Sequence, residues 1–184
     1  AKELGIHLLI GSMVLANDTQ KGDAERAVNR SLYINPQGEI VARYDKIHMF
    51  DVTLASGETH AESHNYQAGS RAVVADVGPA KLGLSICYDL RFAALYRHLA
   101  QAGADIISVP SAFTRPTGEA HWQVLLRARA IETGCFVIAP AQVGTHENGR
   151  ETYGHSLIVD PWGTVLAQAD DTDDFILAEL DLSL

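Results

Sequence analysis

Apolar and polar residues alternate along several short stretches near the start of the chain, as is typical of β-strands with one buried face. Residues 6–13 predict a strand, and residues 31–35 and 39–44 predict a hairpin around an Asn-Pro-Gln-Gly turn at residues 35–38. Asn, Pro and Gly at the first, second and fourth positions favour a type I turn. Residues 17–26 are polar and predict a loop. The pattern therefore predicts antiparallel strands for this part of the chain.

Further along the chain, alternating or short apolar stretches take turns with apolar residues at helical spacing. The predicted strands cover residues 81–87, 104–109, 136–139 and 175–180, and the predicted helices cover residues 91–102 and 120–133. Two of these strands are short runs rich in Ile and Val, which indicates burial on both faces. This order predicts an α/β fold, a layered sandwich with a mixed sheet.

The predicted hairpin has a counterpart near the other end of the chain. SLYINPQGEIVA, at residues 31–42, aligns without gaps on SLIVDPWGTVLA, at residues 156–167. The stretches share Ser, Leu, Pro, Gly and Ala in register. Either two unrelated hairpins use the same good turn, or the fold is internally pseudo-symmetric, and we favour the second interpretation.

The first five residues, AKELG, resemble the last turn of a helix that Gly5 closes in the left-handed conformation. The chain does not begin with methionine. We therefore expect that a segment precedes residue 1 in the natural protein.

Composition narrows the class of protein. The chain has 184 residues, of which 47% are hydrophobic and 20% are charged, as expected of one soluble domain. The net charge of -9 argues against binding to nucleic acid. No apolar run is long enough to cross a membrane. There are two cysteines, Cys87 and Cys135, which suit the cytoplasm better than a disulfide framework.

Cys87 lies where an apolar strand stops and a helix begins, in the stretch GLSICYDLRF at residues 83–92. A tight strand-to-helix turn of this kind, a nucleophile elbow, lifts a side chain out of the sheet. The helix dipole favours a thiolate there, and the backbone N–H of Tyr88 would face a developing oxyanion. The alternative is a small buried hydrophobe, which is the common fate of free cysteines and our prediction for Cys135.

Lys46 ends a predicted strand and enters a long loop rich in His, Gly and acidic residues. Most such lysines are solvated charges, but in an acyl-transfer site a fixed cation would stabilise an oxyanion. In the same loop, His60 and His64 have the i, i+4 spacing of metal ligands. Neither a helical pattern nor a nearby cysteine supports zinc, so we predict no metal site.

Together, four stretches resemble the nitrilase superfamily of carbon–nitrogen hydrolases, and within it the Nit-type amidases. These stretches are DKIHMFD (45–51), GLSICYDLRFAALYR (83–97), AFTRPTGEAHWQVLLRARAIE (112–132) and YGHSLIVDPWG (153–163). The resemblance covers essentially the whole chain. It implies an α-β-β-α sandwich formed by a single carbon–nitrogen hydrolase domain, residues 1–184.

The resemblance also implies the catalytic residues, because the family uses a Glu–Lys–Cys triad with a second glutamate nearby. Cys87 matches the nucleophile, Lys46 the lysine and Glu62 the second glutamate, with Glu58 as a competitor for that role. The first glutamate, the general base, belongs upstream of residue 1, and the family's last helix and tail belong after residue 184. We therefore expect an incomplete domain that is inactive on its own, because a nucleophile without its base loses orders of magnitude in rate.

Four further residues are candidates for supporting roles. We expect Asp89 to cap the helix after Cys87, and Arg91 to brace the elbow through an ion pair. Arg115 is a candidate for binding a substrate carboxylate. Glu119 suits the first turn of the helix predicted near residue 120.

These assignments predict hydrolysis of a small linear amide that bears a carboxylate, such as deaminated glutathione or a 2-oxo-acid amide. The products would be an acid and ammonia, formed through a thioester on Cys87 without any metal or organic cofactor. The resemblance further implies a homodimer or a larger homo-oligomer. The alternatives are an N-carbamoyl amidohydrolase or a nitrilase of the same superfamily, or a catalytically dead fragment that serves as an interaction domain.

Overall fold

The computed structural model describes residues 1–17, 26–53, 57, 59–147, 149–172 and 175–183. Most of the loop predicted at residues 17–26 lies outside the described residues, as does Glu58. The chain divides into two compact units, residues 1–73 and residues 74–184. Each unit is described by itself.

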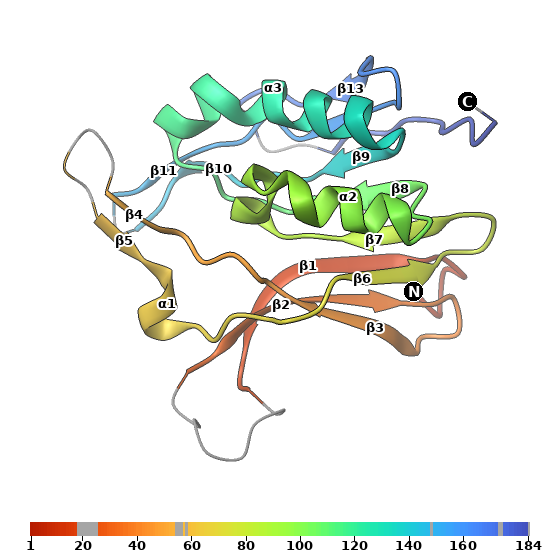
Figure 1. Cartoon of the computed structure of the whole chain (residues 1–184), viewed down its shortest axis with the longest axis horizontal. Coiled ribbons are helices and arrows are strands. Elements are labelled where there is room, and N and C mark those ends of the chain that lie inside the picture. Colours follow the sequence, from red (N-terminus) through yellow and green to blue (C-terminus); the bar gives the residue numbers. More distant parts are fainter. Residues whose placement is uncertain (18–25, 54–56, 58, 148, 173–174, 184) are drawn as a thin grey trace. The chain divides into compact units, whose positions relative to one another are not determined.

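The first unit is built on an antiparallel sheet in the order β1-β2-β3 (Figure 1). Its strands are β1 (Leu8–Leu15), β2 (Val28–Ile34) and β3 (Ile40–Asp45). β1 begins two residues later than predicted because residues 1–6 form a helix-closing turn. The N–H of Gly5 donates to the carbonyl of Lys2 and that of Ile6 to the carbonyl of Ala1, the paired bonds of a Schellman motif.

The stretch predicted as a long loop after Lys46 contains regular structure. Strands β4 (Asp51–Thr53) and β5 (Thr59–Ala61) form an antiparallel pair, and the one-turn helix α1 (Glu62–Asn65) follows at once. These short elements consist mostly of polar residues and carry neither a hydrophobic period nor an apolar run, so the sequence pattern did not predict them.

The second unit is built on a mixed sheet in the order β13-β12-β9-β8-β7-β6. Its strands are β6 (Val73–Asp76), β7 (Lys81–Leu84), β8 (Ile106–Ser108), β9 (Phe136–Ala139), β12 (Leu157–Val159) and β13 (Val165–Gln168). β7, β8 and β9 are parallel, whereas β12 runs antiparallel to both β9 and β13. The predicted mixed sheet is therefore confirmed.

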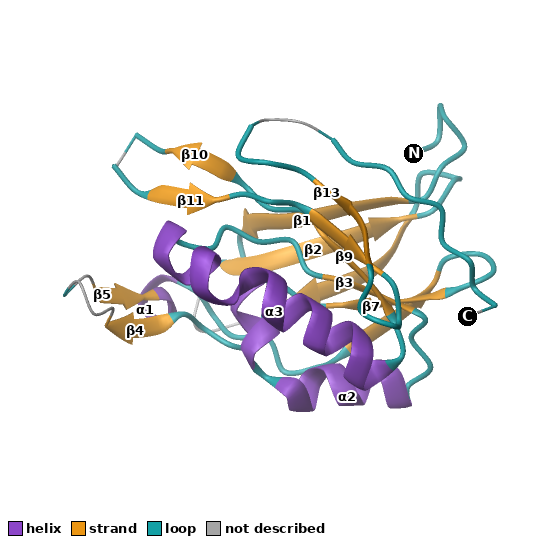
Figure 2. Cartoon of the chain, turned by 90° about the horizontal axis from the view of Figure 1, so that it is seen from above, coloured by secondary structure: helices purple, strands orange, loops and turns teal. Residues whose placement is uncertain are grey.

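Two helices, α2 (Ala93–Gln101) and α3 (Arg115–Thr133), lie side by side against the parallel strands of this sheet (Figure 2). A short 3-10 helix, η1 (Cys87–Arg91), precedes α2, and the hairpin of β10 (Val143–Thr145) and β11 (Glu151–Tyr153) follows β9. The packing follows from the sequence period. Trp122, Leu126 and Ala130 recur every four residues and bury one face of α3.

The two hairpins with similar sequences have the same backbone geometry. In each turn the N–H of a left-handed glycine donates to the carbonyl three residues earlier, Gly38 to Asn35 and Gly163 to Asp160, both over 2.9 Å. The side chain at the first turn position also accepts two backbone N–H groups in both hairpins. The repeat seen in the sequence is therefore a repeat of turn structure.

Strand pairing beside the two turns agrees as well. Tyr33 pairs with Ala42 in the β2–β3 hairpin, and Ile158 pairs with Ala167 in the β12–β13 hairpin. Both ladders shift register at the next pair toward the turn. These positions are equivalent in the ungapped alignment, so even the β-bulge is repeated.

Two further predictions are wrong, one in the start of a helix and one in the type of element. α3 begins at Arg115, not near residue 120, because Gly118 hides the helical pattern. A Cβ at Gly118 would lie 2.3 Å from the Tyr153 side chain, so this helical glycine allows a close approach. Residues 175–180 are not a strand, and their alternation leaves Phe175 and Leu177 exposed rather than buried.

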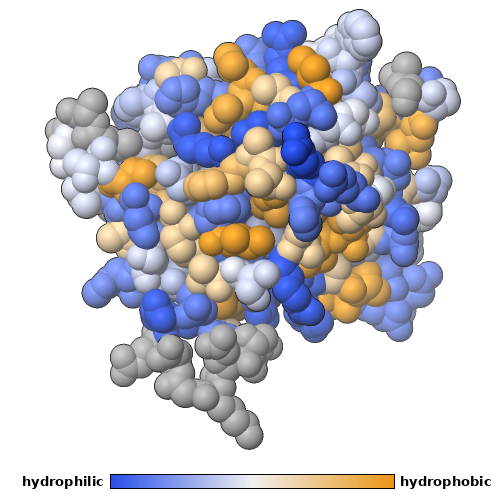
Figure 3. Space-filling view, in the orientation of Figure 1, coloured by the Kyte–Doolittle hydropathy of each residue, from blue (hydrophilic) through white to orange (hydrophobic). Residues whose placement is uncertain are grey.

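The face of the molecule drawn in Figure 3 mixes apolar and hydrophilic side chains, as is usual for folded proteins. Among the described residues, no helix is both long enough and apolar enough to cross a membrane.

Candidate active site

Cys87 occupies a strained position directly after the sheet. Residues 85 and 86 continue the line of β7, and Cys87 is the first residue of η1. Its φ angle is +50°, in the left-handed region that costs a residue with a Cβ roughly 1–2 kcal/mol. The N–H of Cys87 donates to the carbonyl of Pro110 over 3.0 Å, and the side chain is half-buried. A strained, partly accessible side chain at a strand-to-helix turn is the geometry of a nucleophile elbow.

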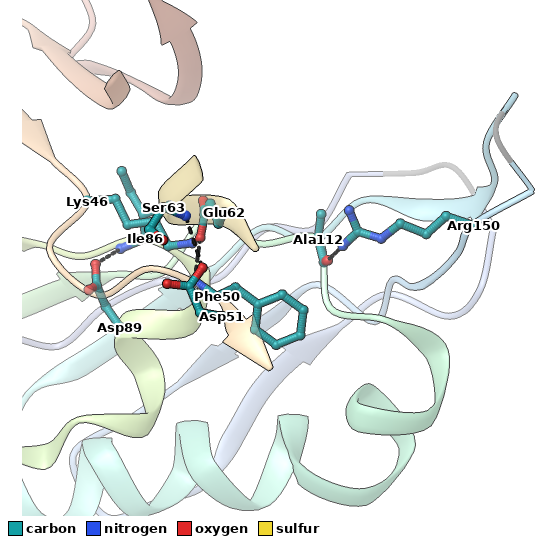
Figure 4. A network of polar contacts seen from close by, with 9 residues as sticks. All are labelled: Lys46, Phe50, Asp51, Glu62, Ser63, Ile86, Asp89, Ala112 and Arg150. Carbon is teal, nitrogen blue, oxygen red and sulfur yellow. Dashed lines mark hydrogen bonds and ion pairs between the residues drawn. The ribbon is translucent and has the colours of Figure 1, made fainter. Parts of the chain in front are cut away.

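Asp89 fixes the start of this turn, as the capping prediction requires. Its carboxylate accepts the N–H of Ile86 over 2.9 Å, and its own N–H donates to the carbonyl of Ile86 (Figure 4). Asp89 is fully buried. The two bonds close a small ring around Cys87 and hold the turn tight.

The contacts of Arg91 differ from the predicted ion pair. Its guanidinium lies over two aromatic rings, with centroid distances of 5.8 Å to Tyr88 and 5.5 Å to Phe113. It also lies 3.3 Å from Nδ1 of His121. Among the contacts described for it, Arg91 therefore braces the elbow through cation–π stacking rather than through a carboxylate.

The first unit brings Lys46 and Glu62 together. Lys46 directly follows β3, Glu62 opens α1, and the two side chains form an ion pair in which Lys46 is only 3% exposed (Figure 4). The same carboxylate oxygen of Glu62 accepts the N–H of Phe50 over 2.6 Å. The two donors fix the position of the Glu62 carboxylate. The carboxylate in turn orients the ammonium group of Lys46.

Asp51 holds α1 in place beside this pair. Its carboxylate accepts the N–H of Ser63 over 2.9 Å, and this bond lowers the pKa of Asp51 below its ordinary value. The backbone N–H of Glu62 donates to the carbonyl of Phe50. The hairpin and the short helix missed by the sequence pattern are therefore what position Glu62.

Backbone contacts also fix Lys46 itself. Its N–H donates to the carbonyl of Asn29, and its carbonyl accepts the N–H of Gly69 over 2.8 Å. A Cβ at Gly69 would lie 2.1 Å from the carbonyl oxygen of Asp45, so only glycine allows this approach. Lys46 is a buried, oriented cation rather than the solvated charge that most such lysines are.

Arg115 is the first residue of α3 and forms an i, i+4 ion pair with Glu119, with Nε 3.2 Å from the carboxylate. Both side chains are about half exposed. Glu119 lies in the second turn of α3, so its predicted first-turn position is wrong because the helix begins earlier. The pair leaves Arg115 accessible, and its role in binding substrate stays a prediction.

Two buried polar side chains that contact the elbow, Arg129 and Tyr96, were not identified from the sequence. Arg129 donates to the carbonyl of Leu90, and Tyr96 shares a hydrogen bond with Ser85. Burial raises the pKa of the Tyr96 phenol far above its ordinary value. The position of Arg129 on the apolar face of a predicted helix was the only signal that the sequence offered, and it did not specify the contacts.

The other polar clusters carry no metal-binding signature. Within the part of the chain that the structure describes, no group of three or more His, Cys, Asp or Glu side chains could hold a metal ion. Cys135 is buried, and its thiol contacts the carbonyl of Ala104. Burial raises the pKa of the Cys135 thiol, which disfavours the reactive thiolate.

Comparison with known proteins identifies the family of the chain. The chain is 50% identical over 161 residues to a deaminated glutathione amidase of Synechocystis sp., covering 86% of this chain and 59% of that protein. It matches the crystal structure of the C. elegans NitFhit protein with a TM-score of 0.90 and 43% identity, over 99% of this chain and 44% of that one. The chain thus spans 59% of the length of the Synechocystis relative and less than half of the NitFhit chain.

A third match concerns the chemistry of a more distant protein. It is a mutant of the amidase from Nesterenkonia sp. AN1, solved with the acetamide moiety of fluoroacetamide added covalently at the active site cysteine. The TM-score is 0.75 and the identity 26%, over 92% of this chain and 59% of that one. The α/β, nitrilase-like fold is confirmed by these structures. The sequence model of the carbon–nitrogen hydrolase family matches residues 1–184, and the chain belongs to this family.

Proposed function

We propose that this chain is the core of an amidase that hydrolyses a small linear amide through a thioester on Cys87. The observation that carries the proposal is the left-handed conformation of Cys87 at the strand-to-helix turn. Membership of the carbon–nitrogen hydrolase family supports the reaction class, and the names of the relatives support an amide as substrate.

In the proposed mechanism the Cys87 thiolate attacks the carbonyl carbon of the amide. The thiol proton passes to a general base, the role that a glutamate has in this family. Lys46 and the N–H of Tyr88 stabilise the oxyanion of the tetrahedral intermediate. The C–N bond then breaks, the leaving nitrogen takes the proton and departs as ammonia, and water hydrolyses the thioester.

Glu62 acts on Lys46 in this proposal. Its carboxylate is held by Lys46 and by the N–H of Phe50, so it keeps the ammonium group oriented through the reaction cycle. An oriented cation is worth more to a transition state than a flexible one, because no reorganisation is needed when the oxyanion forms.

We propose a substrate that bears a carboxylate, in the class of deaminated glutathione, which the Synechocystis relative is named for. Arg115 supplies a guanidinium that suits such a group. Its present pair with Glu119 is exposed and worth only about 0.3–0.5 kcal/mol, so a substrate carboxylate could displace it.

The test measures ammonia release by the natural protein that carries this sequence. Deaminated glutathione, a 2-oxo-acid ω-amide, an N-carbamoyl amino acid and an aliphatic nitrile are compared at equal concentration. We expect the two amides to be preferred by at least about tenfold in kcat/KM, with an acyl adduct on Cys87 in the intact-mass spectrum. Preference for the carbamoyl compound or the nitrile would contradict the proposal, and no turnover of any of them would favour an interaction domain.

We also propose that the protein assembles as a homodimer or larger homo-oligomer. Val124 and Ile131 on α3 are 69% and 57% exposed, and Trp162 in the adjacent β12–β13 turn is 88% exposed. Arg127 joins that turn to α3 by donating to the carbonyl of Gly163, so the three apolar side chains belong to one surface. Light scattering should give at least twice the monomer mass, and a monomer at micromolar concentration would contradict this proposal.

We place the protein in the cytoplasm because both cysteines are free thiols, which suits a reducing compartment. Fractionation of the source cells would test this assignment, and recovery of the protein outside the cytoplasm would contradict it.

A further inference from the structure

We propose that Arg129 and Tyr96 form a clamp that holds Cys87 in its left-handed conformation, and that both are positioning residues for the nucleophile. The proposal rests on the proposed role of Cys87. It concerns two buried side chains on α2 and α3 that the mechanism above does not use.

Arg129 holds the carboxyl-terminal side of the elbow. Its Nε donates to the carbonyl of Leu90 over 2.9 Å, and Leu90 belongs to the same short helix as Cys87. Arg129 is only 6% exposed, so it is a charged side chain kept in the protein interior. Its Nη1 also donates to Glu132 over 2.8 Å, which compensates part of the charge.

Tyr96 holds the amino-terminal side of the elbow. Its hydroxyl lies 2.8 Å from Oγ of Ser85, two residues before Cys87, and Ser85 Oγ donates to the carbonyl of Ser108. The Tyr96 ring lies 5.2 Å from the guanidinium carbon of Arg129. Tyr96 is fully buried. The chain from Ser85 to Leu90 is therefore held at both ends by two side chains that contact each other.

A clamp is needed because the conformation of Cys87 is intrinsically unfavourable. A side chain with a Cβ leaves the left-handed region unless its surroundings fix the backbone on both sides. The Asp89 carboxylate fixes the N–H of Ile86, and the carbonyl of Pro110 fixes the N–H of Cys87 itself. Without the clamp, η1 could shift away from its strand as a unit, and a displacement of about 1 Å at a nucleophile can cost about 100-fold in rate.

The test compares Arg129→Met with Arg127→Met, two substitutions on the same helix. Each removes one Arg Nε–H bond to a backbone carbonyl, because Arg127 donates to Gly163 over 2.8 Å at the distant β12–β13 turn. Arg127 is more exposed than Arg129, so melting temperatures are measured for both. The readouts are kcat and KM for the amide, and the rate at which iodoacetamide alkylates Cys87, located by peptide mass.

For R129M we expect kcat to fall by at least about tenfold and alkylation of Cys87 to slow, with KM changed less than about twofold. R129K should recover part of the lost kcat, because lysine keeps a cation over the Tyr96 ring. R127M should leave all three values unchanged. If R129M lowers only the melting temperature and otherwise behaves as R127M does, Arg129 is merely structural and the proposal is overturned.

Tyr96→Phe gives a second, milder variant in case R129M does not fold. It keeps the ring and removes only the hydroxyl that reaches Ser85. A fall in kcat with slower alkylation of Cys87 would support the clamp, and wild-type values for both would overturn it. The proposed function fails separately: an active Cys87→Ala variant would remove the nucleophile role, whatever the clamp variants show.

Discussion

Replacement of Cys87 by alanine is expected to lower kcat for amide hydrolysis by roughly 10⁴-fold or more. No other group in the proposed mechanism can form the thioester, so the loss should not depend on substrate concentration. The acyl adduct in the intact-mass spectrum should disappear as well. Because alanine accepts the left-handed conformation about as poorly as cysteine does, the fold should change little and the melting temperature should stay close to that of the wild type.

Cys135→Ser is the matched control for this variant. Cys135 is the other cysteine of the chain, and its buried thiol contacts the carbonyl of Ala104. We expect C135S to cost some stability and to retain amidase activity and the acyl adduct. Full activity of C87A, or loss of the adduct in C135S, would show that the nucleophile has been assigned to the wrong residue.

Replacement of Lys46 by methionine is expected to lower kcat by about 10²–10³-fold, the typical loss when a group that stabilises an oxyanion is removed. The variant should also lose about 1–3 kcal/mol of unfolding free energy, because the mostly buried Glu62 side chain loses its ion-pair partner. Steady-state kinetics and denaturant unfolding measure the two effects separately.

The double variant K46M/E62Q separates catalysis from stability. Neutral glutamine can still accept the N–H of Phe50, so stability should largely recover. The activity should not recover, because no cation is left to face the oxyanion. Lys81→Met, at an exposed lysine of β7, is the control and should change neither quantity. Normal activity of K46M would contradict the proposed role of Lys46.

The sequence predicted those parts of the fold that carry a clear apolar pattern or a clear turn motif. β9 was predicted with its observed ends, and the hairpin of β2 and β3 was predicted together with its turn, because the Asn-Pro-Gln-Gly chemistry allows few alternatives. The start of α3 was missed because it contains Gly118, which usually argues against a helix. This glycine is needed for close packing against Tyr153, a contact between residues far apart in the sequence. Residues 175–180 have the alternation of a strand, but alternation does not say which face is buried.

The candidate site also has residues that the sequence indicates and residues that it does not. The roles of Cys87 and Asp89 could be inferred from local sequence, because the end of the strand, the start of the helix and its cap lie within a few residues of one another. Selection of Glu62 came from the family resemblance. Its contact with Lys46 depends on β4, β5 and α1, short and mostly polar elements that no apolar pattern indicates. Tyr96 and Arg129 were missed because their polar atoms reach backbone carbonyls and hydroxyls that no sequence pattern specifies.

The two equivalent hairpins show which positions of a recurring module are free to diverge. Within each turn, the first and fourth residues carry the hydrogen bonds and the left-handed backbone, whereas the third contributes only its backbone N–H. That third position holds Gln37 in one hairpin and Trp162 in the other. The conformation of the turn therefore does not depend on the side chain at the third position. That side chain projects from the turn and can be exchanged without a change in the backbone. Selection could alter what each copy displays without disturbing the strands beneath it.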